Sequence, residues 1–127
     1  MSTEPIHVLL VDDEQDLLDI CGDSFEMEGF KVSPVLSGEK ALDLLAKNDF
    51  DVVISDFMMP EMSGLEFLSQ AQKLCAHKKF PVFIFSTGAV DVNESDVKLK
   101  GASAIIIKPF DIDELINLVK EELKKAQ

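Results

Sequence analysis

The sequence predicts an α/β fold in which a five-stranded parallel sheet carries helices on both faces. Two observations predict it. Five short apolar runs alternate with stretches of helical spacing along the 127 residues, which is the pattern of consecutive β-α units. Four of the five runs also lack regular polar positions, as expected of strands buried on both faces. The length fits a single domain over residues 1–127, with a core that needs neither disulfides nor a structural metal.

The first β-α unit has a clear start and a clear end. Residues 6–11 form a nearly continuous apolar run and predict a buried strand. A helix follows, because Leu18, Cys21 and Phe25 fall on one helical stripe and Gly29 then provides a stop.

The second and third β-α units show the same succession of strand and helix. The segment Lys31–Val35 predicts a second and weaker strand, and Ser37 begins a helix with Glu39 in its first turn. Residues 52–55 predict the third strand, and a helix is expected over about residues 63–76.

The last two units complete the pattern. Residues 82–85 predict the fourth strand and Ala104–Ile107 the fifth, with a short polar helix between them near residues 95–100. The final helix is expected to begin at Asp111, which can cap it together with Glu114 in a capping box. Lysines lie near the other end of this helix, where their positive charge interacts favourably with the helix dipole.

Pro34 indicates the order of the strands. Proline cannot donate to a β-ladder, so the second strand belongs at an edge of the sheet. The strand order 2-1-3-4-5 places it there, and this order defines the flavodoxin-like (βα)5 fold. The sequence therefore predicts a flavodoxin-like sheet with helices on both faces.

Composition excludes several classes of function. The formal net charge is −12, and such a surface repels nucleic acid, so direct nucleic-acid binding is not expected. No apolar run is long enough to span a membrane and no secretion signal is recognisable, so we expect a cytoplasmic protein with no membrane association. Cys21 and Cys75 fit no zinc spacing, and Cys21 is expected to be a small buried hydrophobe.

Polar side chains follow four of the five predicted strands. In a parallel sheet the carboxyl ends of the strands meet at one edge, where ligands bind. Three carboxylates, a hydroxyl group and an amine should therefore converge there. In chain order the candidates are Asp12, Asp13, Glu14, Asp56, Ser86, Thr87 and Lys108.

Phosphoryl transfer suits this set of groups. Carboxylates that lie close together repel one another unless a cation neutralises them, and oxygen ligands favour Mg²⁺. One carboxylate can act as the nucleophile and form an acyl phosphate. Lys108 would then pair with the phosphoryl group as a point charge, and the hydroxyl after the fourth strand could form a new hydrogen bond to it.

Four motifs together resemble one protein family. The order and spacing of these motifs, over essentially the whole chain, are similar to those of the receiver domains of two-component response regulators, of the stand-alone, CheY-like kind. The resemblance also implies a cis peptide bond between Lys108 and Pro109. The motifs are Val11-Asp12-Asp13-Glu14, Ser55-Asp56-Phe57-Met58-Met59-Pro60, Ser63-Gly64 and Lys108-Pro109-Phe110.

The resemblance implies a role for each site residue. Asp56 would be the phosphorylated residue. Asp13 would bind Mg²⁺ directly, Asp12 largely through water, and the main-chain carbonyl of Met58 would complete the protein ligands. Lys108 would contact the phosphoryl group.

The resemblance also implies a switch residue, because the family places a Ser or Thr directly after the fourth strand. Counting from Pro81, this position is Ser86, with Thr87 as the alternative. The sequence departs from the family pattern in two respects. Ile105 holds a position where the family often has an aromatic residue, so coupling is expected to depend on Ser86 and the loop after it. Met58 and Gly88 hold two positions near the site and cannot orient a water molecule, which predicts a long-lived phosphoryl group.

Three classes of function are consistent with these residues to different degrees. The first is a signalling module that takes a phosphoryl group from a histidine kinase or phosphotransfer protein. Such a module is not an enzyme, except that it can catalyse its own phosphorylation and dephosphorylation. Its partners would be a downstream target or an output domain of a longer chain, and phosphorylation could also produce a homodimer. The second class is a pseudo-receiver that only binds proteins, which Ile105 would support. The third is an aspartyl phosphatase, which would need an acid where Met58 stands.

Overall fold

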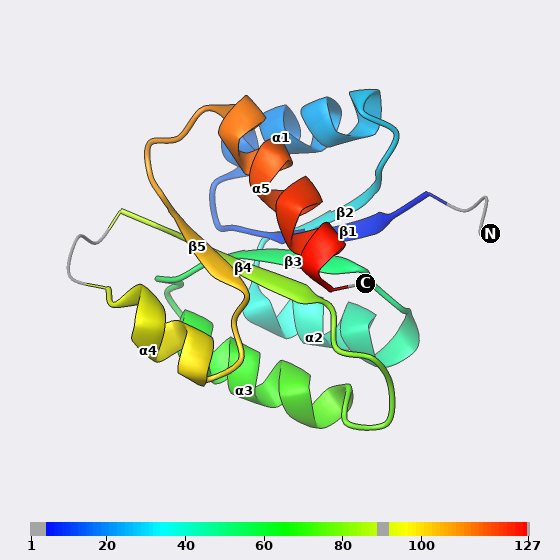
Figure 1. The fold of residues 1–127 in the computed structure, drawn as a ribbon. Helices are drawn as coiled ribbons and strands as arrows, with labels where there is room; N and C mark the ends of the chain where they lie inside the picture. Colours follow the sequence, from blue (N-terminus) through cyan, green and yellow to red (C-terminus); the bar gives the residue numbers. More distant parts are fainter. Residues whose placement is uncertain (1–4, 89–91, 127) are drawn as a thin grey trace.

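The computed structural model describes residues 5–88 and 92–126 as five parallel strands and five helices (Figure 1). The sheet has the order β2-β1-β3-β4-β5, so the predicted fold and strand order are confirmed. The strands are β1 (His7–Val11), β2 (Lys31–Val35), β3 (Val52–Asp56), β4 (Val82–Thr87) and β5 (Ala104–Ile107). The helices are α1 (Gln15–Met27), α2 (Gly38–Lys47), α3 (Gly64–Leu74), α4 (Glu94–Leu99) and α5 (Ile112–Lys125).

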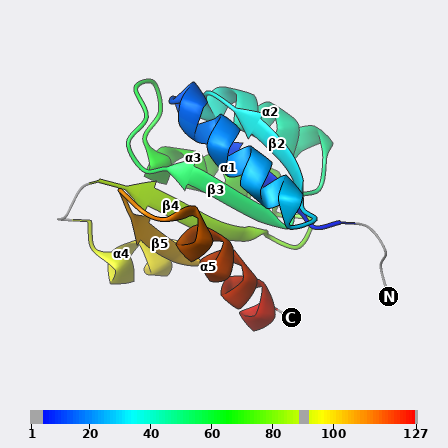
Figure 2. The same ribbon diagram turned by 90° about the horizontal axis from the view of Figure 1, so that it is seen from above.

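The helices cover both faces of the sheet. Helices α1 and α5 lie on one face, and α2, α3 and α4 lie on the other, as Figures 1 and 2 show from two directions. Pro34 lies on edge strand β2 and is exposed, as predicted. Among the described residues, no helix combines the length and the apolar character needed to cross a membrane.

Alternation along the strands divides the core into two layers. Successive side chains of a strand point to opposite faces of the sheet, so each strand contributes to both layers. The layer beneath α1 and α5 includes Leu10, Ile54 and Ile84. The layer beneath α2, α3 and α4 includes Leu9, Val53 and Phe83. Packing on both faces therefore holds the edge of the sheet where the strands end.

Local signals set the helix boundaries, with one correction. The Ser37 side chain accepts a hydrogen bond from the Lys40 N–H and caps α2, and Ser63 caps α3 in the same way. Gly29 follows α1 with φ +95°, a conformation that favours glycine. The predicted capping box of α5 is wrong: Asp111 stands at the N-cap but its side chain forms no capping hydrogen bond, and the backbone oxygen of Asp111 accepts from the Glu114 N–H instead.

Strands β3 and β4 extend further than predicted. Asp56 is the last residue of β3, and both hydroxyl residues belong to β4. Ladder hydrogen bonds to the neighbouring strands account for this, since polar side chains at a strand end do not interrupt backbone pairing. The site residues are therefore held by the sheet itself.

Candidate phosphoacceptor site

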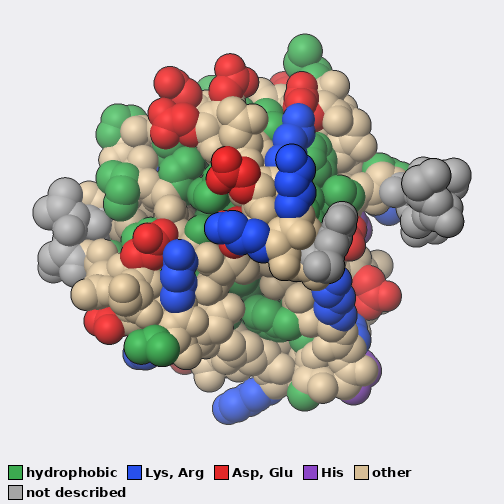
Figure 3. All heavy atoms as spheres, viewed as in Figure 1, with side chains coloured by type: hydrophobic (Ala, Val, Ile, Leu, Met, Phe, Trp, Pro, Cys, Tyr) green, Lys and Arg blue, Asp and Glu red, His purple; other side chains and the backbone are tan. Residues whose placement is uncertain are grey.

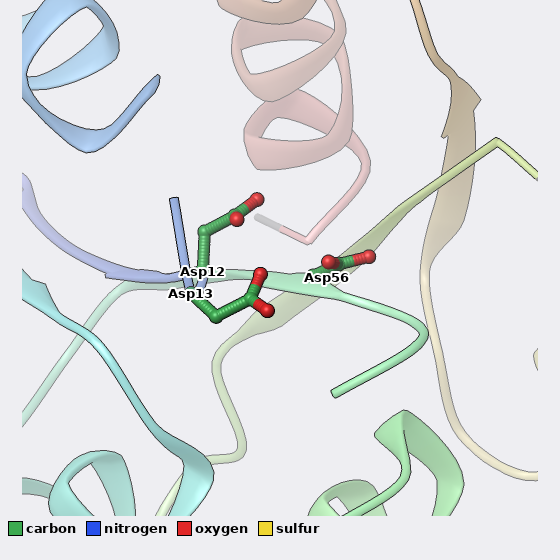
Figure 4. Close-up of side chains that lie close together, drawn as sticks. All are labelled: Asp12, Asp13 and Asp56. Carbon is green, nitrogen blue, oxygen red and sulfur yellow. The ribbon is translucent and has the colours of Figure 1, made fainter. Parts of the chain in front are cut away.

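Three carboxylates meet at the carboxyl edge of the sheet. Asp12 and Asp13 follow β1 directly, and Asp56 ends β3, the neighbour of β1 in the sheet (Figure 4). One oxygen of each carboxylate lies within 4.8 Å of the others. Asp12 and Asp56 are 4% and 8% exposed, whereas Asp13 faces solvent. The structure thus brings together the three acidic residues that the sequence singled out.

Backbone groups orient two of these carboxylates. The Glu14 N–H donates to Asp12 Oδ1 at 3.0 Å, and the Met58 N–H donates to Asp56 Oδ1 at 3.3 Å. Asp12 is also fixed through its own N–H, which donates to the Val35 carbonyl on β2. The second oxygen of each of these two carboxylates, Oδ2, faces Lys108.

Lys108 supplies positive charge to the cluster. Its Nζ lies 3.1 Å from Asp12 Oδ2, 3.6 Å from Asp56 Oδ2 and 3.8 Å from Glu14 Oε1. Burial alone would lower the pKa of Lys108, but the hydrogen bond to Asp12 and the attraction of the other carboxylates raise it overall. Lys108 is therefore held as a cation against the carboxylates.

One lysine does not fully balance the three acids. The pKa of Asp56 is raised, chiefly because burial disfavours the ionised carboxylate, and repulsion from Asp12 and Asp13 adds to this. Lys108 and the Met58 N–H act in the opposite direction without cancelling the shift. The cluster therefore keeps a net negative charge that a further cation could neutralise.

The donor set fits a hard divalent cation. Carboxylate oxygens are available from Asp12, Asp13 and Asp56. Oxygen-only ligands with a net negative charge suit Mg²⁺ better than a softer metal. The acidic cluster can therefore hold a metal ion.

The two hydroxyl residues point to opposite faces of the sheet. Ser86 lies opposite Asp56 in the β3–β4 ladder and shares a face with Ile84, on which Ile54 and Asp56 also fall. Thr87 shares the other face with the Phe side chains of β4. Both residues are buried. Strand geometry thus places Ser86, rather than Thr87, on the same face as Asp56.

The loop after Asp56 depends on a close backbone approach at Gly64. The Gly64 N–H donates to the Phe57 carbonyl at 2.8 Å, and a Cβ at Gly64 would lie 2.8 Å from that oxygen and from a ring carbon of Phe85. The bond between Lys108 and Pro109 is cis, as the resemblance implied. Gly64 therefore allows the loop after Asp56 to fold over the start of α3.

The described residues include only part of the segments through which the signal was expected to leave the site. Ile105 is half-buried against the α2–α3–α4 layer, and its N–H donates to Glu94 Oε2 of α4 at 3.4 Å. The loop after Ser86, on which coupling was expected to depend, extends into residues 89–91, which lie outside the described residues. Glu14 is a neighbour of Lys108 that the site prediction left without a role, although its place in the acidic run was a usable signal.

Comparisons with known proteins agree with this geometry. The family model of the response regulator receiver domain matches residues 8–120. Response regulator SaeR of Staphylococcus aureus is 38% identical over 123 residues, which are 95% of this chain and 52% of SaeR. The chain thus spans about half the length of the curated relatives it matches.

Solved structures show the same fold. A CheY-like response regulator receiver domain protein from Methanospirillum hungatei superposes with a TM-score of 0.85 at 30% identity, covering 95% of each chain. Chemotaxis protein CheY4 of Vibrio cholerae superposes with a TM-score of 0.84 at 28% identity, covering 92% of this chain and 98% of CheY4.

Proposed function

Because the chain belongs to the response regulator receiver family and is a receiver domain of two-component signalling, we propose that Asp56 is its phosphorylated residue and that Mg²⁺ is its cofactor. The observation that carries this proposal is the cluster of Asp12, Asp13 and Asp56 against Lys108. Asp13 and Asp56 would bind the ion directly, Asp12 largely through water, and the Met58 carbonyl would complete the protein ligands. A bound Mg²⁺ would supply positive charge that neutralises phosphoryl oxygens during transfer.

Asp56 acts as the nucleophile in this proposal. An oxygen of the Asp56 carboxylate attacks the phosphorus of a phosphohistidine on a partner kinase or phosphotransfer protein and forms a P–O bond. The P–N bond breaks, its electron pair stays on the imidazole nitrogen, and that nitrogen takes a proton from water. Lys108 is within reach of the new phosphoryl group because its Nζ already lies 3.6 Å from Asp56. A receiver domain is a signalling module, and any catalysis would be limited to its own phosphorylation and dephosphorylation.

The phosphodonor would approach over α1. Two large apolar side chains on this helix are exposed, Ile20 at 60% and Met27 at 87%, and Leu17 is half-buried on the same side. These residues follow a helical spacing, so they form one stripe. Leu17 also borders a hollow with Lys108, which connects the stripe to the site. A helical partner could rest on this stripe while its histidine reaches Asp56.

The signal would leave through Ser86 and the surface formed by α4, β5 and α5. Figure 3 shows this face, where acidic, basic and apolar side chains are mixed. Leu99 and Ile107 are exposed there at 86% and 48%. Helix α4 is attached by side chains at both ends: Glu94 accepts from β5, and Gln72 of α3 donates to the Lys100 carbonyl at 2.7 Å. Phosphorylation would shift these attachments between two arrangements.

Residues 1–127 would act as one cytoplasmic domain. All described strands share one sheet, and both core layers pack against it. A downstream target, or an output domain of a longer chain, would read the altered surface.

Beryllofluoride provides the direct test. With Mg²⁺ present it should shift amide resonances around Asp56, Ser86 and Lys108 in the wild type but not in Asp56→Ala. Unchanged spectra of the wild type would contradict the proposal. Acetyl phosphate should label the wild type, and the Mg²⁺-dependent label should outlast seconds because Met58 and Gly88 orient no water. Decay within seconds would contradict the predicted long lifetime.

A further inference from the structure

Met59 and Met62 line a hollow beside the acidic cluster. The hollow has a volume of about 230 Å³ and lies between the start of α2 and the loop that precedes α3. Both methionines are half-buried, and Leu36 beside them is 40% exposed. A Cβ at Gly38 would lie 3.0 Å from Met62 Sδ, so the absence of a side chain at Gly38 leaves room for the thioether. We call this depression the methionine hollow.

The methionine hollow has an apolar floor that can adapt. Methionine side chains are unbranched and polarisable, and proteins use them where a binding surface must fit an irregular partner. The Ser55 hydroxyl donates to the Asp56 carbonyl at 3.0 Å and lies 4.0 Å from Met59 Sδ, so the inner end of that side chain contacts β3. Both methionines also pack against the core layer beneath α2, α3 and α4, so each presents only part of its side chain to the hollow.

The rim of the methionine hollow is acidic. Asp13, Glu39 and Glu61 all line it and are exposed, and none of its lining residues is a lysine. On a chain of net charge −12, this rim favours a lysine or arginine that is placed next to an apolar side chain.

Asp13 connects the methionine hollow to phosphoryl transfer. Asp13 lines the hollow, and its carboxylate lies in the cluster with Asp56 that Figure 4 shows, so an occupant that contacts Asp13 reaches the edge of the reaction site. Asp56 is only 8% exposed, and a protein that presents a phosphohistidine to it must cover the surrounding loops. A downstream target has no such requirement.

We propose that the methionine hollow seats a segment of the phosphodonor protein that carries a lysine or arginine beside an apolar side chain. This inference rests on the proposed function of Asp56. The hollow and the α1 stripe lie on different sides of the site, so a donor that engages both is oriented by two contacts. Specificity for one donor would come from the charge and the apolar fit of this second contact.

Charge reversal on the rim tests the proposal. The variant carries Glu39→Lys and Glu61→Lys, and its matched control carries Asp43→Lys and Glu121→Lys, two exposed acids outside the hollow. The donor is the histidine phosphotransfer domain, chosen from a panel, that labels the wild type fastest. We expect a kcat/KM for this donor about tenfold lower in the rim variant, an unchanged value in the control, and similar labelling of all three proteins by acetyl phosphate.

Further arms keep the outcomes distinct. If the lysine variant does not fold, Glu39→Gln with Glu61→Gln should show a smaller loss of the same kind. Unchanged transfer from the protein donor would overturn the proposal, as would an equal loss with acetyl phosphate, which would place the effect on the reaction site. A change in self-association with normal transfer would assign the hollow to a second copy and also overturn it. If acetyl phosphate with Mg²⁺ does not label the wild type, the proposed function fails and this inference fails with it.

Discussion

Replacing Asp56 by asparagine should stabilise the metal-free protein. With an effective dielectric constant of about 20, a carboxylate pair at the 4.8 Å limit of the cluster costs roughly 3.5 kcal/mol, and the Lys108–Asp56 pair at 3.6 Å returns roughly 4.6 kcal/mol. Two such repulsions therefore exceed the single attraction by roughly 2 kcal/mol before solvent screening. Solvent around exposed Asp13 reduces this penalty, while burial of Asp56 adds to it. We expect Asp56→Asn to raise the free energy of unfolding by about 1 kcal/mol in EDTA, or Tm by about 3–5 °C.

The pH dependence of this difference has a definite sign. Burial raises the pKa of Asp56 above its ordinary value of 3.8, so the folded state binds a proton more readily than the unfolded state. The stability contributed by the protonated group is present below the ordinary pKa and is lost as pH rises through the raised one. The advantage of Asp56→Asn should therefore be complete at pH 7.5 and shrink as pH is lowered toward 4.

Thermal unfolding with and without Mg²⁺ measures the effect. At tenfold excess over Kd, Mg²⁺ should stabilise the wild type by about 1.4 kcal/mol, and it should stabilise Asp56→Asn less. Asp43→Asn makes the same charge change at an exposed position on α2 and should stay within about 0.5 kcal/mol of the wild type. If Asp56→Asn in EDTA is no more stable than Asp43→Asn, the carboxylates are not under mutual repulsion and the reasoning fails.

Three further predictions concern packing, thiol chemistry and the switch. Gly64→Ala should lower the free energy of unfolding in urea by about 2–3 kcal/mol, because its Cβ would lie 2.8 Å from a backbone oxygen; Gly88→Ala, with open space around the Cβ, should cost much less. Burial raises the pKa of Cys21 to about 11, so its thiol should resist alkylation at pH 8 until the protein is unfolded, and rapid labelling of the folded protein would contradict this. Ser86→Ala should reduce the beryllofluoride-induced spectral changes on α4 and β5 more than Thr87→Ala, and the opposite ranking would assign the switch to Thr87.

Much of the fold was predictable because the signals were local. The segment Lys31–Val35 and the segment Ala104–Ile107 have the predicted bounds. Ala104–Ile107 is an apolar run, whereas Lys31–Val35 is more polar and is bounded by Gly29 on one side and Ser37 on the other. The edge position of β2 followed from Pro34 alone. The capping box at Asp111 failed because a capping residue pair permits the hydrogen bond but does not require it.

The convergence of the acidic residues was predictable for a topological reason. Parallel strands end at one edge, and the order 2-1-3 makes β1 and β3 neighbours, so Asp12 and Asp56 had to lie close together. Side-chain partners could not be predicted in this way. The 3.1 Å contact between Lys108 and Asp12 depends on the path of the chain after β5, and the methionine hollow depends on how two loops far apart in sequence meet.

The charge balance at the site explains why phosphorylation can act as a switch. Three carboxylates and one lysine leave about two negative charges, which is the charge that a divalent cation neutralises. An acyl phosphate on Asp56 would place more negative charge beside Lys108 than the carboxylate did, and so would compete with Asp12 for the same ammonium group. Lys108 follows β5 directly, and its N–H donates to the Thr87 carbonyl at 2.8 Å. A shift of Lys108 toward the phosphoryl group would therefore act on the carboxyl ends of β4 and β5. Strand β5 also carries Ile105, whose N–H attaches α4 through Glu94. Beside the path through Ser86, a second path would thus run through Lys108 and two strand ends, and neither path needs an aromatic side chain at Ile105.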